Sequence, residues 1–467
     1  MNKTKIIAKV RENNSTTEIL KELILSGIDA FCLDLDKVSN DFCLDVINKI
    51  NNLNDTLKTN VAIMLETVGS KIHVNKFVGG STNFKTGDKI RIYVDNTLGD
   101  ETKLSVDCKE LIDIVKYDSI IKIAHGSVEL QVLDKGDNFL LCEVLRGGIV
   151  YNNDVVTTPG VKANHKFLTK KDKDIINFAS KYNVDYIVLS GVTSLDDVLE
   201  INDLLIDVEN NHIGIISKIE NQFALDEIDD IINISDGIII SREELGSAIP
   251  VERIPGIQKS LINKCHLEGK ISIVSTKIIP DTKLSNAQVS DIANAVLDGT
   301  DAVMITQYNR SNEYPISLLK ETERIIKSAE EDIDYMNFLD RAVRSESQNI
   351  TGNIACSVAE IANRLKCKAI VAPTISGYTA RKMSRFRPRA VIVAISTDKE
   401  TIRSLSIYFG VYPVLIDSLK SLDDIVKQAK KIVVENMDVG KGDKIIITGG
   451  YPFKEVKHTN LIEIEEL

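Results

Sequence analysis

A chain of 467 residues is too long for one hydrophobic core, so about two to four domains are expected. The net charge is −11, but no basic run long enough for nucleic-acid binding and no near-transmembrane apolar segment occurs, so we expect neither nucleic acid nor membrane as a partner. The start, MNKTKIIAKV, lacks a signal peptide's apolar region and the seven cysteines form no CxxC pair, which predicts a cytoplasmic protein with free thiols.

Short, almost continuously apolar segments follow one another along the first two thirds of the chain. We count about eight of them, at residues 4–10, 30–35, 61–66, 186–190, 214–220, 236–241, 271–276 and 301–306. Helix-length amphipathic segments such as STTEILKELILSG lie between most of them. Continuous apolar runs are typical of strands covered on both faces, so the pattern predicts a closed parallel (β/α)8 barrel.

Residues 71–156 interrupt this alternation. They contain short strand patterns such as GDKIRIYVD, with Asp-Gly and Gly-Gly turn signals between them. Such a connection far exceeds an ordinary βα loop, so we expect an inserted small β-barrel domain that acts as a lid over the barrel mouth. The barrel itself would then comprise residues 1–70 and 157–340. A second alternation of helices and strands predicts an open C-terminal α/β domain over residues 341–467.

Polar side chains occur where the predicted barrel strands end, which is where the chemistry of such barrels gathers. They are Asp34, Asp36, Glu66, Thr67, Ser190, Lys218, Glu220, Arg242, Glu243, Glu244, Thr276 and Lys277. Glu220 and Glu244 together suit Mg²⁺ or Mn²⁺, which favours a few carboxylates plus substrate oxygens. Lys218 beside such a metal would stabilise a developing anion or a transferring phosphoryl group. The alternative is a structural ion pair lining the barrel, and Asp34 and Asp36 would equally suit a solvated loop.

The stretch TISGYTARK, from Thr374 to Lys382, lies between a predicted strand and a predicted basic helix. Hydroxyl groups, a glycine and backbone amides at a helix N-terminus can bind an anion. Threonine and serine also serve as N-caps, so a simple capped turn is the alternative. The density of hydroxyls at the start of a basic helix favours phosphate binding.

Several long motifs resemble the signatures of pyruvate kinases, and the similarity covers nearly the whole chain. They are ISKIENQ, SDGIIISREELGSAIP, DIANAVLDGTDAVMIT, EYP, SGYTARKMSRFRP, KGDKIIITGGYP and HTNL. The resemblance implies transfer of the phosphoryl group of phosphoenolpyruvate to ADP, which gives pyruvate and ATP, with Mg²⁺ (or Mn²⁺) and usually K⁺. It also implies a homo-oligomer, usually a tetramer, that is often activated by a sugar phosphate.

The resemblance assigns roles to individual residues. Lys218 matches the lysine that stabilises the phosphoryl group, and Thr276 matches the threonine that helps to protonate the enolate carbon. Glu220 and Glu244 match the Mg²⁺ ligands, although Glu244 replaces an aspartate and is one methylene longer. Positions that bind substrate in the family are occupied here by Ser190, Glu243 and Lys277.

Two further ligand sites follow from the resemblance. The K⁺ site would comprise Asp34, Asp36, Glu66 and Thr67. Lys71 stands where family members that dispense with K⁺ carry a lysine, so its ammonium group is expected to take over the charge of that ion. The sugar-phosphate loop would comprise Thr374, Ser376, Gly377 and Thr379.

Several positions depart from the family's pattern. Cys32 replaces an arginine that binds phosphate, His73 replaces another arginine, and Val68 replaces a lysine. Glu243 replaces a glycine and adds a carboxylate near an anionic substrate. Loss of one arginine contact to a buried dianion costs roughly 2–5 kcal/mol.

These departures leave three functions open. The first is a divergent, K⁺-independent pyruvate kinase. The second is a catalytically inactive paralogue that binds phosphorylated ligands or partner subunits. The third is another Mg²⁺-dependent enolate reaction on a keto acid such as oxaloacetate, since Lys218 and Glu220 suit any metal-bound enolate.

Overall fold

The computed structural model describes residues 2–35, 38–69, 71–162, 167–207, 212–278, 284–307, 316–346, 349–418, 421–450 and 459–467. Within them, eight parallel strands form a closed barrel in the order β1-β17-β16-β15-β14-β13-β3-β2. The strands are β1 (Lys5–Val10), β2 (Ala30–Asp34), β3 (Ala62–Glu66), β13 (Tyr186–Leu189), β14 (Gly214–Ile219), β15 (Gly237–Ser241), β16 (Ile271–Ile278) and β17 (Ala302–Gln307). All eight segments predicted as strands are barrel strands, so the predicted (β/α)8 barrel is confirmed.

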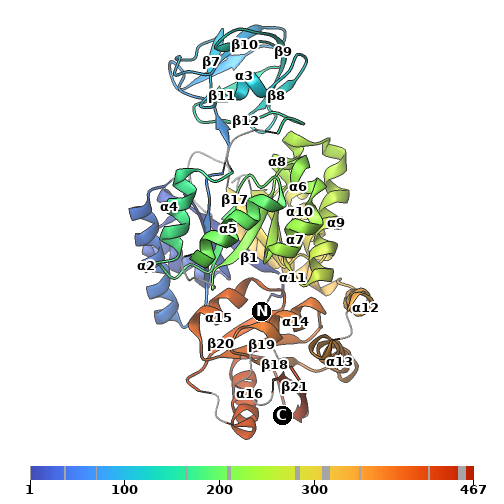
Figure 1. Cartoon of the computed structure of the whole chain (residues 1–467). Coiled ribbons are helices and arrows are strands. Elements are labelled where there is room, and N and C mark those ends of the chain that lie inside the picture. Colours follow the sequence, from blue (N-terminus) through green and yellow to red (C-terminus); the bar gives the residue numbers. More distant parts are fainter. Residues whose placement is uncertain are drawn as a thin grey trace.

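Helices surround the barrel and cover the outer face of its strands, whereas the inner face packs inside the barrel, so the strands are apolar on both faces (Figure 1). They are α1 (Thr17–Leu25), α2 (Asn40–Leu57), α4 (Lys170–Ala179), α5 (Leu195–Asp207), α6 (Gln222–Asp226), α7 (Ile228–Ile234), α8 (Arg242–Ala248), α9 (Ile254–Glu268), α10 (Asn286–Leu297), α11 (Ile316–Glu331) and α12 (Tyr335–Ser345). Local sequence sets several of their ends. Ser285 and Gln288 form a capping box at the start of α10, and Gly269 ends α9 with a φ of +68°.

A separate sheet domain lies above one end of the barrel in Figure 1. Its seven-stranded sheet has the order β4-β12-β8-β9-β10-β6-β7, and β11 and β5 form a two-stranded sheet. The strands are β4 (Ile72–His73), β5 (Ser81–Phe84), β6 (Lys89–Tyr93), β7 (Lys103–Ser105), β8 (Ile120–Ile123), β9 (Val128–Lys135), β10 (Phe139–Arg146), β11 (Gly148–Tyr151) and β12 (Val155–Thr157), with the short helix α3 (Leu111–Ile114). This domain has an apolar core of its own, which centres on residues such as Ile90, Leu130 and Leu140.

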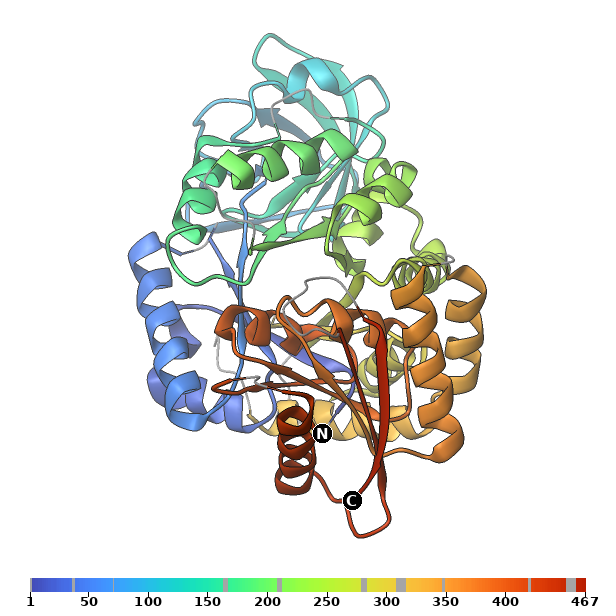
Figure 2. The same ribbon diagram turned by 60° about the horizontal axis from the view of Figure 1, so that its bottom comes forward.

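The C-terminal α/β domain lies at the opposite end of the barrel (Figures 1 and 2). Its sheet has the order β20-β19-β18-β21-β22, in which only β22 is antiparallel to its neighbour. The elements are α13 (Ile350–Leu365), β18 (Ala369–Pro373), α14 (Tyr378–Arg385), β19 (Val391–Ser396), α15 (Lys399–Ser404), β20 (Val411–Leu415), α16 (Leu422–Asn436), β21 (Lys444–Gly449) and β22 (Leu461–Glu466).

The C-terminal domain closes the floor of the barrel, meaning the end at which the strands begin. Apolar residues inside the barrel, such as Ile7 and Ile271, belong to one buried cluster with Phe386 and Leu405 of the C-terminal domain. The end of the barrel that the C-terminal domain leaves uncovered is the one at which the strands finish, beneath the sheet domain. Among the described residues, no helix combines the length and the apolar character that crossing a bilayer requires.

Candidate active site at the carboxyl ends of the barrel strands

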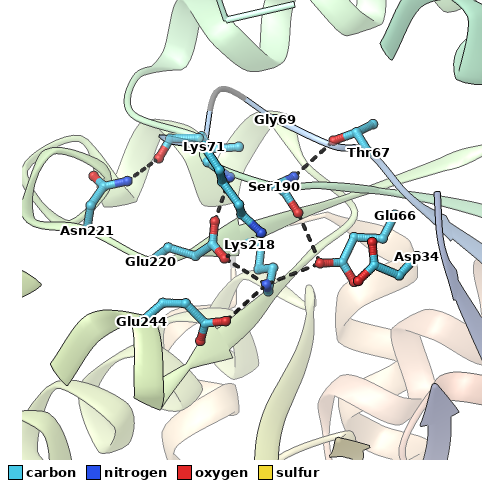
Figure 3. Close-up of polar contacts among 12 residues, drawn as sticks. Asp34, Glu66, Thr67, Gly69, Lys71, Ser190, Lys218, Glu220, Asn221 and Glu244 are labelled. Atoms are coloured by element: carbon cyan, nitrogen blue, oxygen red, sulfur yellow. Dashed lines mark hydrogen bonds and ion pairs between the residues drawn. The ribbon is translucent and has the colours of Figure 1, made fainter. Parts of the chain in front are cut away.

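The alternation of strand side chains explains which polar residues enter the barrel. Val188 and Ile216 belong to the apolar layer inside the barrel, and side chains two positions further along a strand point the same way. The next inward residues are Ser190, which directly follows β13, and Lys218 in β14. By the same rule Met64 is followed by Glu66, so polar groups from several strands meet above the apolar layer (Figure 3).

Lys218 is the centre of this group. It is 4% exposed, and its Nζ lies 2.7 Å from Glu220 Oε1, 3.1 Å from Glu66 Oε1 and 3.5 Å from Glu244 Oε1. Burial alone would lower the pKa of Lys218, but these three carboxylates outweigh it and raise the pKa well above its usual range. Lys218 is therefore a permanently charged ammonium group, and the three predicted carboxylates converge on it.

Glu66 is shared between two lysines. Its Oε1 accepts a hydrogen bond from Ser190 Oγ at 3.0 Å, and its Oε2 lies 2.5 Å from Lys9 Nζ. Burial would raise the pKa of Glu66, but Lys218, Lys9 and Lys71 together hold that pKa well below its usual range. Glu66 therefore remains a carboxylate at all physiological pH values.

Lys9 is a site residue that the sequence did not reveal. It lies opposite Cys32 in the register of β1 and β2, and its Nζ is 3.7 Å from Asp34 Oδ2. Burial lowers the pKa of Lys9, but Glu66 and Asp34 outweigh burial, so the net shift is upward. The available signal was its position two residues after the inward-facing Ile7 at the end of the first strand.

Cys32 contributes no charge to the site. Burial, and then the negative charge of Glu66, raise the pKa of the Cys32 thiol, so it stays protonated. The thiol lies 3.8 Å from Glu66 Oε2, which accepts its weak hydrogen bond. A positive charge at this level of the barrel therefore comes from the neighbouring strand, through Lys9.

Glu220 and Glu244 occupy the side of the cluster away from β1. Glu220 Oε2 accepts a hydrogen bond from the backbone N–H of Gly191 at 2.6 Å, and its Oε1 lies 3.7 Å from Lys71 Nζ. Glu244 is in the first turn of α8, where a helix N-terminus favours negative charge. Burial would raise the pKa of Glu244, but Lys218 and then Lys71 lower it to about 2.

Glu220 and Glu244 are the two carboxylates to which the resemblance assigned a divalent cation. Both place Oε1 against the ammonium group of Lys218, so the point that these two oxygens share is occupied by a positive charge of the chain itself. Across the described ranges, no group of three or more His, Cys, Asp or Glu residues forms a complete metal site. A Mg²⁺ or Mn²⁺ ion at these two carboxylates would compete with Lys218 for them and would need its remaining oxygens from substrate and water.

Two predicted K⁺ ligands have other partners. Thr67 Oγ1 accepts a hydrogen bond from the backbone N–H of Ser190 at 3.1 Å, and Asp34 lies beside Lys9. Asp36 falls outside the described residues. Gly69, two residues after Thr67, has a φ of +68°, and a Cβ there would lie 2.5 Å from the carbonyl oxygen of Ser190. The chain after β3 therefore runs directly against the end of β13.

Thr276, Glu243 and Lys277 form a second polar group near α8. Arg242 Nη2 donates to Thr276 Oγ1 at 3.3 Å, and Lys277 Nζ lies 3.3 Å from Glu243 Oε1. Glu243 and Lys277 line a cleft of about 500 Å³ whose other wall belongs to the sheet domain and includes His125. The cleft is a candidate site for a ligand held between these two domains.

Two histidines of the sheet domain differ in their relation to the site. His73, at a position where the family has arginine, pairs within the sheet domain with Asp107, with 3.3 Å between His73 Nδ1 and Asp107 Oδ2. His125 lines the cleft, and its imidazole is among the groups that lower the pKa of Glu244. The turn sequence around His125 carried no signal for this role.

The predicted phosphate loop connects β18 to α14. Gly377 is the N-cap of α14 with a φ of +76°, and Thr374 is buried. The hydroxyl of Thr379 lies 3.0 Å from that of Thr459, and Thr401 Oγ1 donates to Ile375 O at 2.9 Å. Ser376 is at the turn itself, so the structure brings all four predicted residues into one loop and helix start.

Three comparisons with known proteins point to one family. The model "Pyruvate kinase, barrel domain" matches residues 1–319, and "Pyruvate kinase, alpha/beta domain" matches residues 352–465. A pyruvate kinase of Staphylococcus saprophyticus is 36% identical over 99% of this chain and 80% of its own length. One from Clostridium perfringens is 33% identical over 100% of both chains. The crystal structure of a Cryptosporidium parvum pyruvate kinase matches with a TM-score of 0.90 and 30% identity, over 100% of this chain and 96% of that one.

Proposed function

Because the chain belongs to the pyruvate kinase family, we propose that it transfers the phosphoryl group of phosphoenolpyruvate to ADP, giving pyruvate and ATP. Full-length identities of 33% and 36% to proteins named pyruvate kinase support this function. The observation that carries the proposal is the contact of Lys218 Nζ with three carboxylates at the strand ends. A cytoplasmic location and a tetrameric assembly belong to the same proposal.

The site residues suit the two steps of this reaction. The bond between the phosphorus and the enol oxygen breaks as a bond to a β-phosphate oxygen of ADP forms, and Lys218 stabilises the charge on the transferring group. Glu220 and Glu244 would hold Mg²⁺, which when bound neutralises charge on substrate oxygens. The enolate then takes a proton at its methylene carbon, near Thr276, whose hydroxyl Arg242 orients. We assign Ser190, Glu243 and Lys277 to substrate binding.

The alternative is an inactive paralogue that binds phosphorylated ligands or partner subunits. Cys32 is the observation that favours it, because a protonated thiol cannot grip a phosphate as an arginine does. On either function, Thr374, Ser376, Gly377 and Thr379 are proposed to bind a sugar phosphate. A thermal shift with a sugar bisphosphate that Ser376→Ala abolishes would support this assignment, and an unchanged shift in Ser376→Ala would refute it.

A coupled assay with phosphoenolpyruvate, ADP and Mg²⁺ decides between the two functions. We expect turnover in the wild-type protein and a fall in kcat of about 10²–10³-fold in Lys218→Ala, the usual cost of a lost charge-stabilising donor. Lys264→Ala is the matched control, because Lys264 pairs with Asp229 on the surface. Turnover that Lys218→Ala leaves unchanged would refute the mechanism, and no turnover in the wild type would favour the paralogue.

A further inference from the structure

Asp34 and Glu66 form a pair of like charges inside the barrel. They are direct neighbours in the register of β2 and β3, and both point inward above the apolar layer. Two carboxylates placed side by side in a mostly buried position repel each other unless a cation lies between them or one of them takes up a proton. The sequence resemblance led us to expect K⁺ at this place.

Lys9 already supplies that cation. Its side chain is 12% exposed, and its Nζ lies 2.5 Å from Glu66 Oε2 and 3.7 Å from Asp34 Oδ2. A second monovalent cation at these oxygens would meet the ammonium group within a few ångströms and be repelled by it. The site therefore does not fit K⁺. Lys71, to which the resemblance assigned this role, forms an ion pair with Glu220, and its charge also helps to lower the pKa of Glu66.

We propose that Lys9 is a built-in monovalent cation that replaces K⁺ between Asp34 and Glu66. It acts as a positioning residue, because it holds one oxygen of Glu66 while the other oxygen faces Lys218 and Ser190. The effect of Lys9 on turnover rests on the proposed pyruvate kinase function. The replacement of K⁺ by the ammonium group of Lys9 is independent of that function.

The first test compares cations in the kinetic assay. Tetramethylammonium, which is too bulky to enter the site, is compared with K⁺ and NH₄⁺ at constant ionic strength. We expect the wild type to show the same kcat in all three within about twofold. In tetramethylammonium, the kcat of Lys9→Ala should be about 100-fold below that of the wild type, which is the scale of a lost preorganised charge. In K⁺ or NH₄⁺, the kcat of Lys9→Ala should recover by at least about tenfold.

Lys5→Met is the matched control. Lys5 is a buried lysine of the same strand, and its Nζ lies 3.6 Å from Asp29 at the floor of the barrel. Its variant should show no preference among the three cations. If Lys9→Ala folds poorly, Lys9→Ala/Asp34→Asn removes one of the two like charges and should keep a weaker preference for K⁺.

The second test is the melting temperature, which needs no turnover. K⁺ should raise the melting temperature of Lys9→Ala above its value in tetramethylammonium and leave that of the wild type unchanged. This result together with an inactive wild type would support the role of Lys9 and refute the proposed function. Strong activation of the wild type by K⁺, or a Lys9→Ala protein indifferent to the cation in both tests, would overturn the inference.

Discussion

The ion pair between Asp185 and Arg403 joins the floor of the barrel to the C-terminal domain. Asp185 is 3% exposed, and Arg403 Nε lies 3.0 Å and 3.2 Å from its two oxygens. Asp185 Oδ2 also accepts the backbone N–H of Ile63 in β3 at 2.8 Å. We predict that Arg403→Met destabilises the protein and that the loss depends on pH.

The magnitude follows from the pKa of Asp185, which burial raises from 3.8 to about 6 although Arg403 opposes the shift. At 1.36 kcal/mol per pKa unit, the folded state favours the protonated form by about 3 kcal/mol. Between pH of about 4 and about 6 the folded state keeps a proton that the unfolded state has lost, so stability falls as the pH rises. Removal of Arg403 raises this pKa further. Arg403→Met should therefore lower the free energy of unfolding by about 3–5 kcal/mol at pH 8, where it leaves an unpaired carboxylate buried. At pH 5 the loss should be about 1 kcal/mol.

Thermal unfolding at the two pH values measures the difference. An unfolding entropy of about 2.1 cal/mol/K per residue gives roughly 1 kcal/mol per degree for 467 residues. Arg403→Met should therefore lower the Tm by roughly 3–5 °C at pH 8 and by about 1 °C at pH 5. The double variant Asp185→Asn/Arg403→Met has no carboxyl to titrate, so its Tm loss relative to the wild type should not be larger at pH 8 than at pH 5. An equal or larger loss at pH 5 in Arg403→Met would refute the reasoning.

Three further predictions concern the site and the core. Gly69→Ala places a Cβ 2.5 Å from Ser190 O and should lower both Tm and kcat. Gly87→Ala is the control: a Cβ at Gly87 meets no atom within 4 Å, so kcat should stay unchanged. Equal effects of the two substitutions on kcat would contradict this prediction. Burial lowers the pKa of His266 to about 3, so stability falls by up to about 5 kcal/mol between pH of about 6.5 and 3. His266→Leu should therefore unfold at a lower pH than the wild type when acid unfolding is followed by circular dichroism. An unchanged pH midpoint of unfolding would contradict this prediction. The lowered pKa of Glu66 contributes stability above pH 4.5 that is lost as the pH falls through that pKa, so the Tm deficit of Glu66→Gln should shrink in acid rather than grow.

The sequence allowed the barrel to be predicted because its strands are continuous apolar runs, and runs of that kind suit only strands covered on both faces. It also allowed the meeting of Lys218, Glu220, Glu244 and Glu66 to be predicted, since parallel strands bring their carboxyl ends to one rim.

Lys9 was missed because a lysine near the end of an apolar strand carries no local signal. Its place beside Cys32 follows from strand register, and its pairing with Glu66 depends on the order in which β1, β2 and β3 close the barrel. The position of His125 in the wall of the cleft depends on how the sheet domain lies above α8. The turn sequence around His125 does not encode this domain arrangement.

The shared core at the barrel floor limits how this chain can be recombined. A cut between α12 and α13 would divide one apolar cluster, so neither fragment would carry a complete interior. A chimera with a relative's C-terminal domain would need an apolar surface to cover Ile7 and Ile271 and an arginine to meet Asp185. The exchangeable unit is therefore the C-terminal domain together with the floor residues that it covers.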